Sequence, residues 1–195
     1  MPKKYSEVEK ANIKKDLRLH AERSLFHKGV KGTSVDELVN LAMIPKGTFY
    51  LFYETKEALF FDVLVSFRLQ MQDEMMAMLQ ELDENHIVTS LTTVFAYLVE
   101  NMYRRGIFRL LNEEEMHMIS RKNEEDIYKK ERKELLSFFR ELFSLFAIDD
   151  KDDIDAFFNS FLLIVYSMNY ADRMKKPLDA WRMLLRGLIL QLVGE

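Results

Sequence analysis

The chain has 195 residues, 48% of them hydrophobic, with no cysteine and a formal net charge of −4. This apolar fraction is sufficient for a sizeable buried core, and the lack of cysteine excludes disulfides, zinc–thiolate centres and thiol nucleophiles. No stretch approaches the roughly 18 apolar residues of a membrane span, and no secretory signal pattern opens the sequence, so we expect a cytoplasmic protein.

The charges are divided unevenly along the chain. Residues 1–57 contain 11 Lys or Arg and 8 Asp or Glu, which gives +3 and leaves −7 for residues 58–195. A mildly basic N-terminal segment on an acidic remainder suits a protein that touches nucleic-acid phosphates at one end only. The surplus is small, so it supports this interpretation without establishing it.

The pattern of apolar residues predicts an all-α protein of about nine helices. Only three prolines and six glycines interrupt the chain, and alternating strand patterns are missing. The first helix is expected to begin near Tyr5 and to end at Gly29 and Gly32. It carries one apolar stripe at four-residue spacing, formed by Ile13, Leu17, Ala21 and Leu25.

A sharp corner is predicted after the second helix. That helix opens at Ser34, which with Glu37 fits the capping-box pattern, and lasts about nine residues. Pro45 cannot continue it but suits the first turn of a new helix, so the corner falls at Met43 and Ile44. Two short helices joined in this way indicate a helix-turn-helix, whose second helix can enter a DNA major groove.

The residues after the corner suit contact with DNA. Lys46, Thr48 and Tyr50 carry hydrogen-bond donors, and Gly47 lets the backbone approach a phosphate or a base edge. Lys56, at the start of the next helix, adds a cation. The alternative is that these are ordinary surface and spacer residues.

The segment TSVDELVNLAMIPKGTFYLFYETKEAL, residues 33–59, closely resembles the N-terminal domain of tetracycline-repressor-like (TetR family) transcription regulators. In that family a T-S-V-x-x-L/I-A turn leads to K-G-T-L/F-Y and then to S/T-K-E-x-L, and the resemblance covers about residues 10–62. Family members often have Gly where Met43 stands and Ser where Pro45 stands, so the details of the corner are expected to differ. The resemblance implies a DNA-binding set in which Thr33 and Lys56 contact phosphates; the set is Thr33, Ser34, Lys46, Gly47, Thr48, Tyr50 and Lys56.

The resemblance further implies two domains. Residues 1–55 form the helix-turn-helix DNA-binding domain, and residues 56–195 form a helical domain for ligand binding and dimerisation. The expected helices of the second part cover residues 55–82, 87–103, 107–119, 121–146, 152–173 and 178–193.

The second part is rich in Met and Phe, which suit a cavity for an apolar or aromatic guest as well as an ordinary core. By the resemblance, such a cavity holds an inducer. The predicted lining residues are Phe67, Met71, Met102, Tyr103, Phe139, Phe143 and Tyr166.

A homodimer on a palindromic operator is predicted, because one short recognition helix reads too few base pairs and paired heads about 34–36 Å apart double the site. The segments 154–168 and 181–193 are apolar enough to form the interface, or else to complete the core of one monomer. The predicted interface residues are Phe158, Phe161, Leu162, Val165, Leu184, Leu188 and Leu192.

No motif for catalysis, for a cofactor or for a metal is visible. The four histidines are scattered, and the dense cluster of residues 113–115 with His117 is either a solvated surface or a ligand sensor. The sequence therefore predicts a sequence-specific DNA-binding transcriptional regulator, a repressor released by a small, largely apolar ligand. The alternatives are an enzyme and a helical partner-binding or structural bundle without DNA binding.

Overall fold

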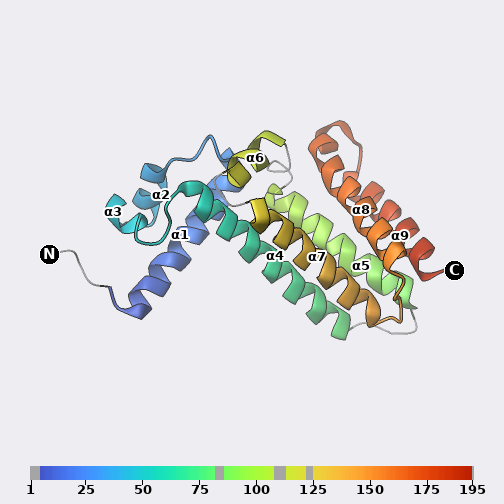
Figure 1. Ribbon diagram of the computed structural model, residues 1–195. Coiled ribbons are helices and arrows are strands. Elements are labelled where there is room, and N and C mark those ends of the chain that lie inside the picture. The colour runs from blue at the N-terminus through green and yellow to red at the C-terminus, as the bar shows by residue number, and fades with distance from the viewer. Residues whose placement is uncertain (1–4, 82–85, 108–112, 122–124, 195) are drawn as a thin grey trace. The chain divides into compact units, whose positions relative to one another are not determined.

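The computed structural model describes residues 5–81, 86–107, 113–121 and 125–194, and within these ranges it contains helices and no strand (Figure 1). The prediction of an all-α chain with about nine helices is confirmed for this part. Residues 82, 108–112 and 122–124 of the predicted helices lie outside it. The elements are α1 (Glu7–Lys28), α2 (Val35–Leu41), α3 (Lys46–Phe49), α4 (Lys56–Gln80), α5 (Ile87–Arg105), α6 (Glu113–Arg121), α7 (Glu125–Ser144), α8 (Lys151–Ser167), the 3-10 helix η3 (Met168–Arg173) and α9 (Pro177–Val193).

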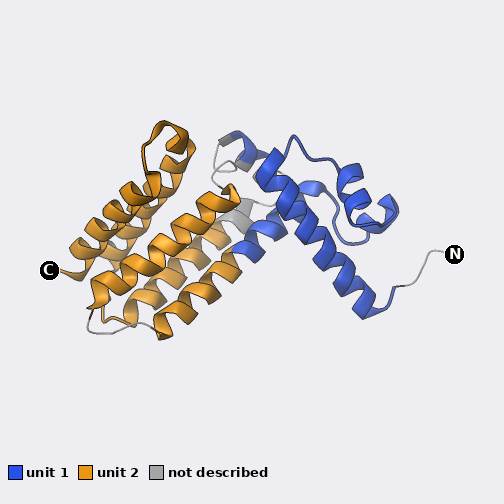
Figure 2. Cartoon of the chain, turned by 180° about the vertical axis from the view of Figure 1, so that it is seen from behind, with its two compact units in different colours: residues 1–67, 112–125 blue, residues 68–111, 126–195 orange. Residues whose placement is uncertain are grey.

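The chain packs as two compact units (Figure 2). The first, which we call the head, comprises residues 1–67 and 112–125; the second, which we call the body, comprises residues 68–111 and 126–195. Helix α4 belongs to both units, since the division falls between Phe67 and Arg68. The predicted domain boundary between residues 55 and 56 stays a prediction. Among the described helices, none is both long and apolar enough to cross a membrane.

The core of the head is built from the stripe that the sequence predicts. Leu17, Ala21 and Leu25 of α1 are fully buried, together with Leu38 of α2 and Phe49 of α3. A capping box at Ser6 and Glu9 starts α1. The helix-turn-helix is therefore held to α1 by apolar packing, with α2 in contact with both α1 and α3.

Polar contacts add to this packing. Asp62 of α4 accepts hydrogen bonds from the hydroxyl of Tyr53 and from Nε of Arg18, the latter at 2.7 Å. Thr55 caps α4, because its hydroxyl accepts the backbone N–H of Ala58 at 3.1 Å. These hydrogen bonds fix α1 and the segment after α3 to the first part of α4.

The core of the body is aromatic. The ring of Phe95 on α5 lies 5.0–5.8 Å, between centroids, from four other phenylalanine rings, those of Phe139, Phe143, Phe157 and Phe161. Helix α9 packs on α5 and α8, and its Trp181 donates to Oγ of Ser167 at 2.8 Å. The single tryptophan of the chain is therefore a buried reporter of the body.

Candidate nucleic-acid interface

The corner ends α2 with a Schellman motif. The backbone N–H of Ile44 donates to the carbonyl of Val39 at 3.0 Å, and that of Met43 to the carbonyl of Asn40 at 3.2 Å. Met43 has φ 52°, the left-handed conformation that the motif requires and that Gly adopts without strain. Its side chain is 91% exposed, so no packing offsets this strain.

Ser34 starts α2, although the predicted capping box forms only in part. The Ser34 hydroxyl accepts the backbone N–H of Glu37 at 3.1 Å. The carboxylate of Glu37 does not complete the box, because it instead accepts from Nζ of Lys28 at 2.6 Å. The ammonium group of Lys28 on α1 therefore binds the carboxylate that the sequence pattern assigns to the capping box.

Helix α3 presents an open face to solvent. Pro45 takes the N-cap position, where no side chain caps the helix. Lys46, Gly47 and Tyr50 are exposed, and a Cβ added at Gly47 would meet no other atom within 4 Å. The backbone at Gly47 is thus open to close approach by a large ligand such as duplex DNA.

Lys46 is paired with an acid that the sequence interpretation did not single out. Its Nζ lies 2.8 and 3.0 Å from the two carboxylate oxygens of Asp36 in the first turn of α2. The hydrogen bond and the charge of Asp36 raise the pKa of Lys46. An Asp in a first helical turn is also favoured by the helix dipole, so the sequence alone gives no signal for this pairing.

Two members of the predicted DNA-binding set are turned into the head. Thr33 is 1% exposed and donates its hydroxyl to the carbonyl of Gly29 at 3.0 Å. Thr48 is 6% exposed, and its hydroxyl lies 3.0 Å from that of Tyr5. Their side chains hold the local structure, whereas those of Ser34, Lys46 and Tyr50 remain exposed.

Lys56 also has partners within the head. Its Nζ donates to the carbonyls of Val30 at 2.6 Å and Thr33 at 2.7 Å, in the turn between α1 and α2. Lys56, which is predicted to contact a phosphate, therefore also holds the turn between α1 and α2 in place. The ammonium group has a third hydrogen, which a phosphate could accept.

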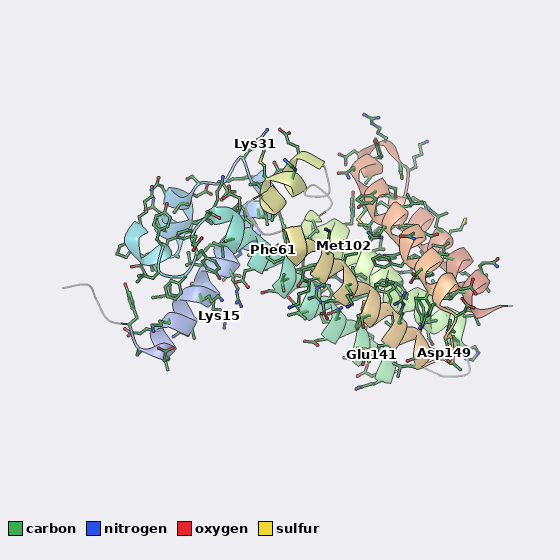
Figure 3. All side chains as sticks on the ribbon, viewed as in Figure 1. Lys15, Lys31, Phe61, Met102, Glu141 and Asp149 are labelled. Atoms are coloured by element: carbon green, nitrogen blue, oxygen red, sulfur yellow. The ribbon has the colours of Figure 1, made fainter. Side chains whose placement is uncertain are left out.

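The same turn is held from its other side by α6. The carboxylate of Glu115 accepts the backbone N–H of Val30, and Glu114 pairs with Lys31, which projects from the turn (Figure 3). Gly29 has φ 73°, and a Cβ there would lie 3.0 Å from the Glu115 carboxylate, so only Gly fits. These two acids of the predicted cluster thus contact the turn between α1 and α2, while the side chain of Glu113 lies outside the described residues.

The predicted effector residues lie in different surroundings. Phe67 packs edge-on against Phe26 in the head, at 6.2 Å between centroids, whereas Tyr103 packs against Trp181 in the body at 5.2 Å. Phe139 and Phe143 belong to the aromatic core, Met71 is buried, Met102 is half-buried and Tyr166 is exposed. Their assignment to a ligand cavity stays a prediction.

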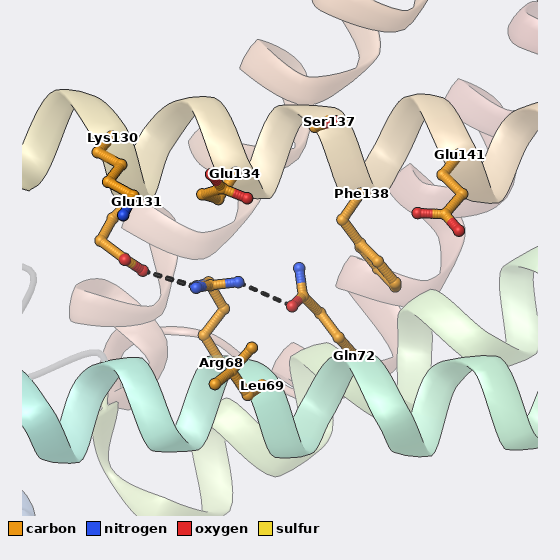
Figure 4. A pocket seen from close by; sticks show the side chains of 9 residues that line it. All are labelled: Arg68, Leu69, Gln72, Lys130, Glu131, Glu134, Ser137, Phe138 and Glu141. Carbon is orange, nitrogen blue, oxygen red and sulfur yellow. Dashed lines mark hydrogen bonds and ion pairs between the residues drawn. The ribbon is translucent and has the colours of Figure 1, made fainter.

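The body does contain a pocket of about 440 Å³ between α4 and α7, open to solvent (Figure 4). Arg68 crosses it, 2.8 Å from the carboxylate of Glu131 and 2.8 Å from the side-chain oxygen of Gln72. None of the seven predicted effector residues lines it, and most of its lining is polar. The lining residues are Arg68, Leu69, Gln72, Lys130, Glu131, Glu134, Ser137, Phe138 and Glu141.

The predicted dimer residues divide into buried and accessible ones. Phe158, Phe161 and Val165 face the body's own core and are 2–3% exposed. Leu184 is exposed, and Leu162, Leu188 and Leu192 are half-buried. The exposed apolar side chains of α8 and α9 include others that the sequence did not single out for an interface: Leu163, Tyr166 and Met183.

A comparison with known protein families finds a match for residues within the head. The family model of bacterial regulatory proteins of the tetR family matches residues 19–63, which contain all seven predicted DNA-binding residues. No curated protein sequence matches the chain. Members of this family are transcription factors and not enzymes, so the match favours the predicted regulator over both alternatives.

Solved structures match along nearly the whole chain. A protein described as a TetR-family transcriptional regulator from Mesorhizobium loti has a TM-score of 0.70 and 19% identity, covering 94% of this chain and 96% of that one. Thermus thermophilus FadR, a TetR-family repressor in complex with lauroyl-CoA, has a TM-score of 0.58 and 18% identity, covering 90% and 93%. NalD, the secondary repressor of the MexAB-OprM multidrug efflux pump in Pseudomonas aeruginosa, has a TM-score of 0.57 and 19% identity, covering 91% and 95%. Residues 19–63 therefore match the DNA-binding domain of tetR-family regulators, and nearly the whole chain shares the fold of these solved structures; together they support the function of a DNA-binding transcriptional regulator.

Proposed function

We propose that the chain is a cytoplasmic, homodimeric repressor that binds a palindromic operator through the exposed face of α3 and releases it when a small apolar effector binds. The observation that carries this proposal is the open face of α3, where Lys46 and Gly47 in its first turn and Tyr50 at its C-cap are exposed. A recognition helix that enters a groove by its N-terminal end needs such a face.

The seven predicted DNA-binding residues take two roles in this proposal. Ser34, Lys46, Gly47 and Tyr50 touch DNA directly, since they are exposed on or beside α3. The buried Thr33 and Thr48 position that surface. Lys56 does both, since it holds the turn through two of its hydrogens and reaches a phosphate with the third.

The proposed dimer forms through the exposed apolar face of α8 and α9. Met183 and Leu184 are 77% and 55% exposed on α9, and Leu163 is 70% exposed on α8. Gly187 continues the α9 stripe, and a Cβ there would meet nothing within 4 Å, which allows a partner helix to approach closely. Large apolar side chains gathered on one face are typical of a protein interface.

The dimer is tested by charge substitution. The double substitution Met183→Glu and Leu184→Glu should give a monomer in sedimentation at micromolar concentration, because two carboxylates would be buried unpaired in the interface. Lys133→Glu, on exposed α7, is the matched control and should leave a dimer. A parent protein that sediments as a monomer contradicts the proposal.

The proposed effector is a molecule with an apolar chain or ring. The Met- and Phe-rich body supports this, as does the lauroyl-CoA bound to the Thermus relative. The proposed lining is the predicted set from Phe67 to Tyr166. An effector that favours a non-binding state of the dimer by 1–3 kcal/mol would weaken operator binding about 5- to 150-fold.

The reading head is tested by substitution on α3. Lys46→Ala with Tyr50→Ala should abolish selection of specific sequences from a pool of random DNA duplexes, while circular dichroism stays unchanged. Gly47→Ala should also weaken binding but leave the fold intact, since the added methyl group meets no protein atom. Lys15→Ala, on the exposed surface of α1, is the control (Figure 3). Unchanged selection by the double variant would falsify the assignment of α3 as the reading helix.

The effector is tested by adding lauroyl-CoA and lauric acid to the complex of the parent protein with its selected duplex. Release by either compound supports an apolar effector, and release by lauroyl-CoA alone shows that the CoA portion is needed. An apolar effector is contradicted when a compound binds in the body, as followed by the fluorescence of Trp181, and the DNA affinity does not change.

A further inference from the structure

The ion pair between Asp36 and Lys46 lies on the surface that we propose for DNA binding. It joins the first turn of α2 to the first residue of α3, and its two side chains are 69% and 51% exposed. An ion pair this exposed adds little to the stability of a fold. The two helices are already anchored by Leu38 and Phe49, which are fully buried. The pair is therefore available for another role.

This pair is poorly suited to binding phosphates. A lysine that binds a phosphate releases a counterion from DNA, but a lysine neutralised by a carboxylate contributes no net charge to that process. Asp36 would also repel the phosphates themselves. The charge balance at this point thus favours contact with something other than the DNA backbone.

The pair is suited to the edges of bases in the major groove. A Lys ammonium donates to O6 and N7 of guanine, and an Asp carboxylate accepts from N4 of cytosine. Guanine O6 and cytosine N4 lie side by side in one G·C pair, as the Lys ammonium and the Asp carboxylate do in this structure.

We propose that Asp36 is a specificity-determining residue of this regulator, which together with Lys46 reads one G·C base pair in each half of the operator. Asp36 accepts a hydrogen bond from cytosine N4, and Lys46 donates to guanine O6 and N7. This inference rests on the proposed function, since it takes the exposed face of α3 as the DNA-binding face.

The same geometry rejects two of the other three base pairs, A·T and the reversed pair C·G. When thymine replaces cytosine, its O4 acceptor faces the carboxylate of Asp36, and the amino group of adenine faces the ammonium of Lys46. When the G·C pair is reversed, guanine O6 faces the carboxylate. Each of these two replacements leaves like groups opposed at both ends, so Asp36 contributes as much as Lys46 to their rejection. A T·A pair keeps an acceptor opposite Lys46 and a donor opposite Asp36, and it is distinguished by the thymine methyl group that stands where guanine has N7.

The test compares the sites that the full-length parent and the variant Asp36→Asn select from a pool of random duplexes, at one fixed salt concentration. The parent should prefer G·C at one position of each half-site, and D36N should lose that preference by about 5- to 150-fold while keeping the others. D36N should also bind the unselected pool more tightly, because Lys46 is then free to meet a phosphate. In a separate titration with salt, its affinity for that pool should fall more steeply than that of the parent, by about one charge per head.

Two further variants complete the test. Glu37→Gln removes the same charge from the next residue, whose carboxylate pairs with Lys28, and it should leave base preference unchanged. Lys46→Met should lose the same G·C preference as D36N, and the double variant should lose no more, because the two residues act as one unit.

The outcomes separate this inference from the proposed function. When the parent enriches a site and D36N enriches the same site with the same preference at every position, the role of Asp36 is overturned and the regulator is not. When the parent enriches no sequence, the proposed function and the role of Asp36 are both overturned.

Discussion

The contacts that stabilise the head internally differ in kind from those that stabilise the body. In the head, apolar packing is supplemented by hydrogen bonds between defined atoms: Arg18 and Tyr53 to Asp62, and Lys56 to two carbonyls of one turn. At the centre of the body, phenylalanine rings surround Phe95. The head therefore depends on particular atoms in particular places, and the body depends on filled volume.

The sequence resemblance to a known family lies in the head. A hydrogen bond between two set atoms is satisfied by few residue types, whereas a core can be filled by many residues of similar volume. The family model matches residues 19–63, within the head. Along nearly the whole chain the similarity to the three solved structures is one of fold, at 18–19% identity.

The largest expected effect is the loss of a ring from the body. Phe95→Ala should lower the free energy of unfolding by about 3–5 kcal/mol, because it leaves a cavity among four rings. Phe95→Met keeps most of the volume and should cost about 1.5 kcal/mol or less. Urea unfolding followed by Trp181 fluorescence measures both. Equal losses for the two variants would mean that ring contacts, and not volume, hold the body.

The next effect concerns a polar tie in the head. Lys56→Met keeps the length of the side chain but leaves the carbonyls of Val30 and Thr33 without their donor, which should cost about 1–3 kcal/mol. Hydrogen exchange of the α1 and α2 amides reports the loss. Lys15→Met, an equal change of charge on an exposed part of α1, is the control. Unaltered exchange in K56M would show that Lys56 does not stabilise the head and acts in DNA binding alone.

The local features of the head follow from short sequence signals, and they could be predicted. Ser34 and Thr55 cap helices by bonding three residues ahead, and Pro45 starts the helix that follows the corner. Such contacts depend on neighbours in the chain, so a pattern of a few letters is enough.

Contacts between distant residues could not be predicted in the same way. The partners of Lys56 lie 23 and 26 positions away, and Val30, which donates to Glu115, lies 85 positions away from it. The stripe on α8 and α9 was predicted as apolar, but which of its residues face the core depends on how those helices pack against α5 and against each other. Apolar periodicity identifies a helix and leaves the rotation of a largely apolar helix undetermined.

A smaller effect is expected at the corner. Met43→Gly should raise the free energy of unfolding of the head by about 1 kcal/mol, because the left-handed backbone is strained for Met and relaxed for Gly. The exposed Met43 side chain has no packing to lose. Hydrogen exchange of the α2 amides measures the gain. A loss of stability would show that Gly's freedom in the unfolded chain outweighs the strain that it removes.

The smallest effect is a dependence on pH that is expected to be stronger in the head than in the body. Burial, and then the hydrogen bond to Asp62, raise the pKa of Tyr53 above its ordinary value near 10. The unfolded chain therefore loses this proton first, so the contribution is complete below pH 10 and is lost progressively as the pH rises from that value towards the raised pKa of the folded protein. At pH 10.5 the loss should be less than about 1 kcal/mol, since that pH is only half a unit above the unfolded pKa. The difference between the parent and Tyr53→Phe, measured by urea unfolding at pH 7.5 and 10.5, isolates the contribution of Tyr53 from that of other groups.

Tyr97 in the body provides the comparison: the pKa of this more accessible hydroxyl is raised mainly by its hydrogen bond to Glu74. Tyr97→Phe should therefore change the pH dependence less than Tyr53→Phe does, and the reverse order would contradict the leading role of burial at Tyr53.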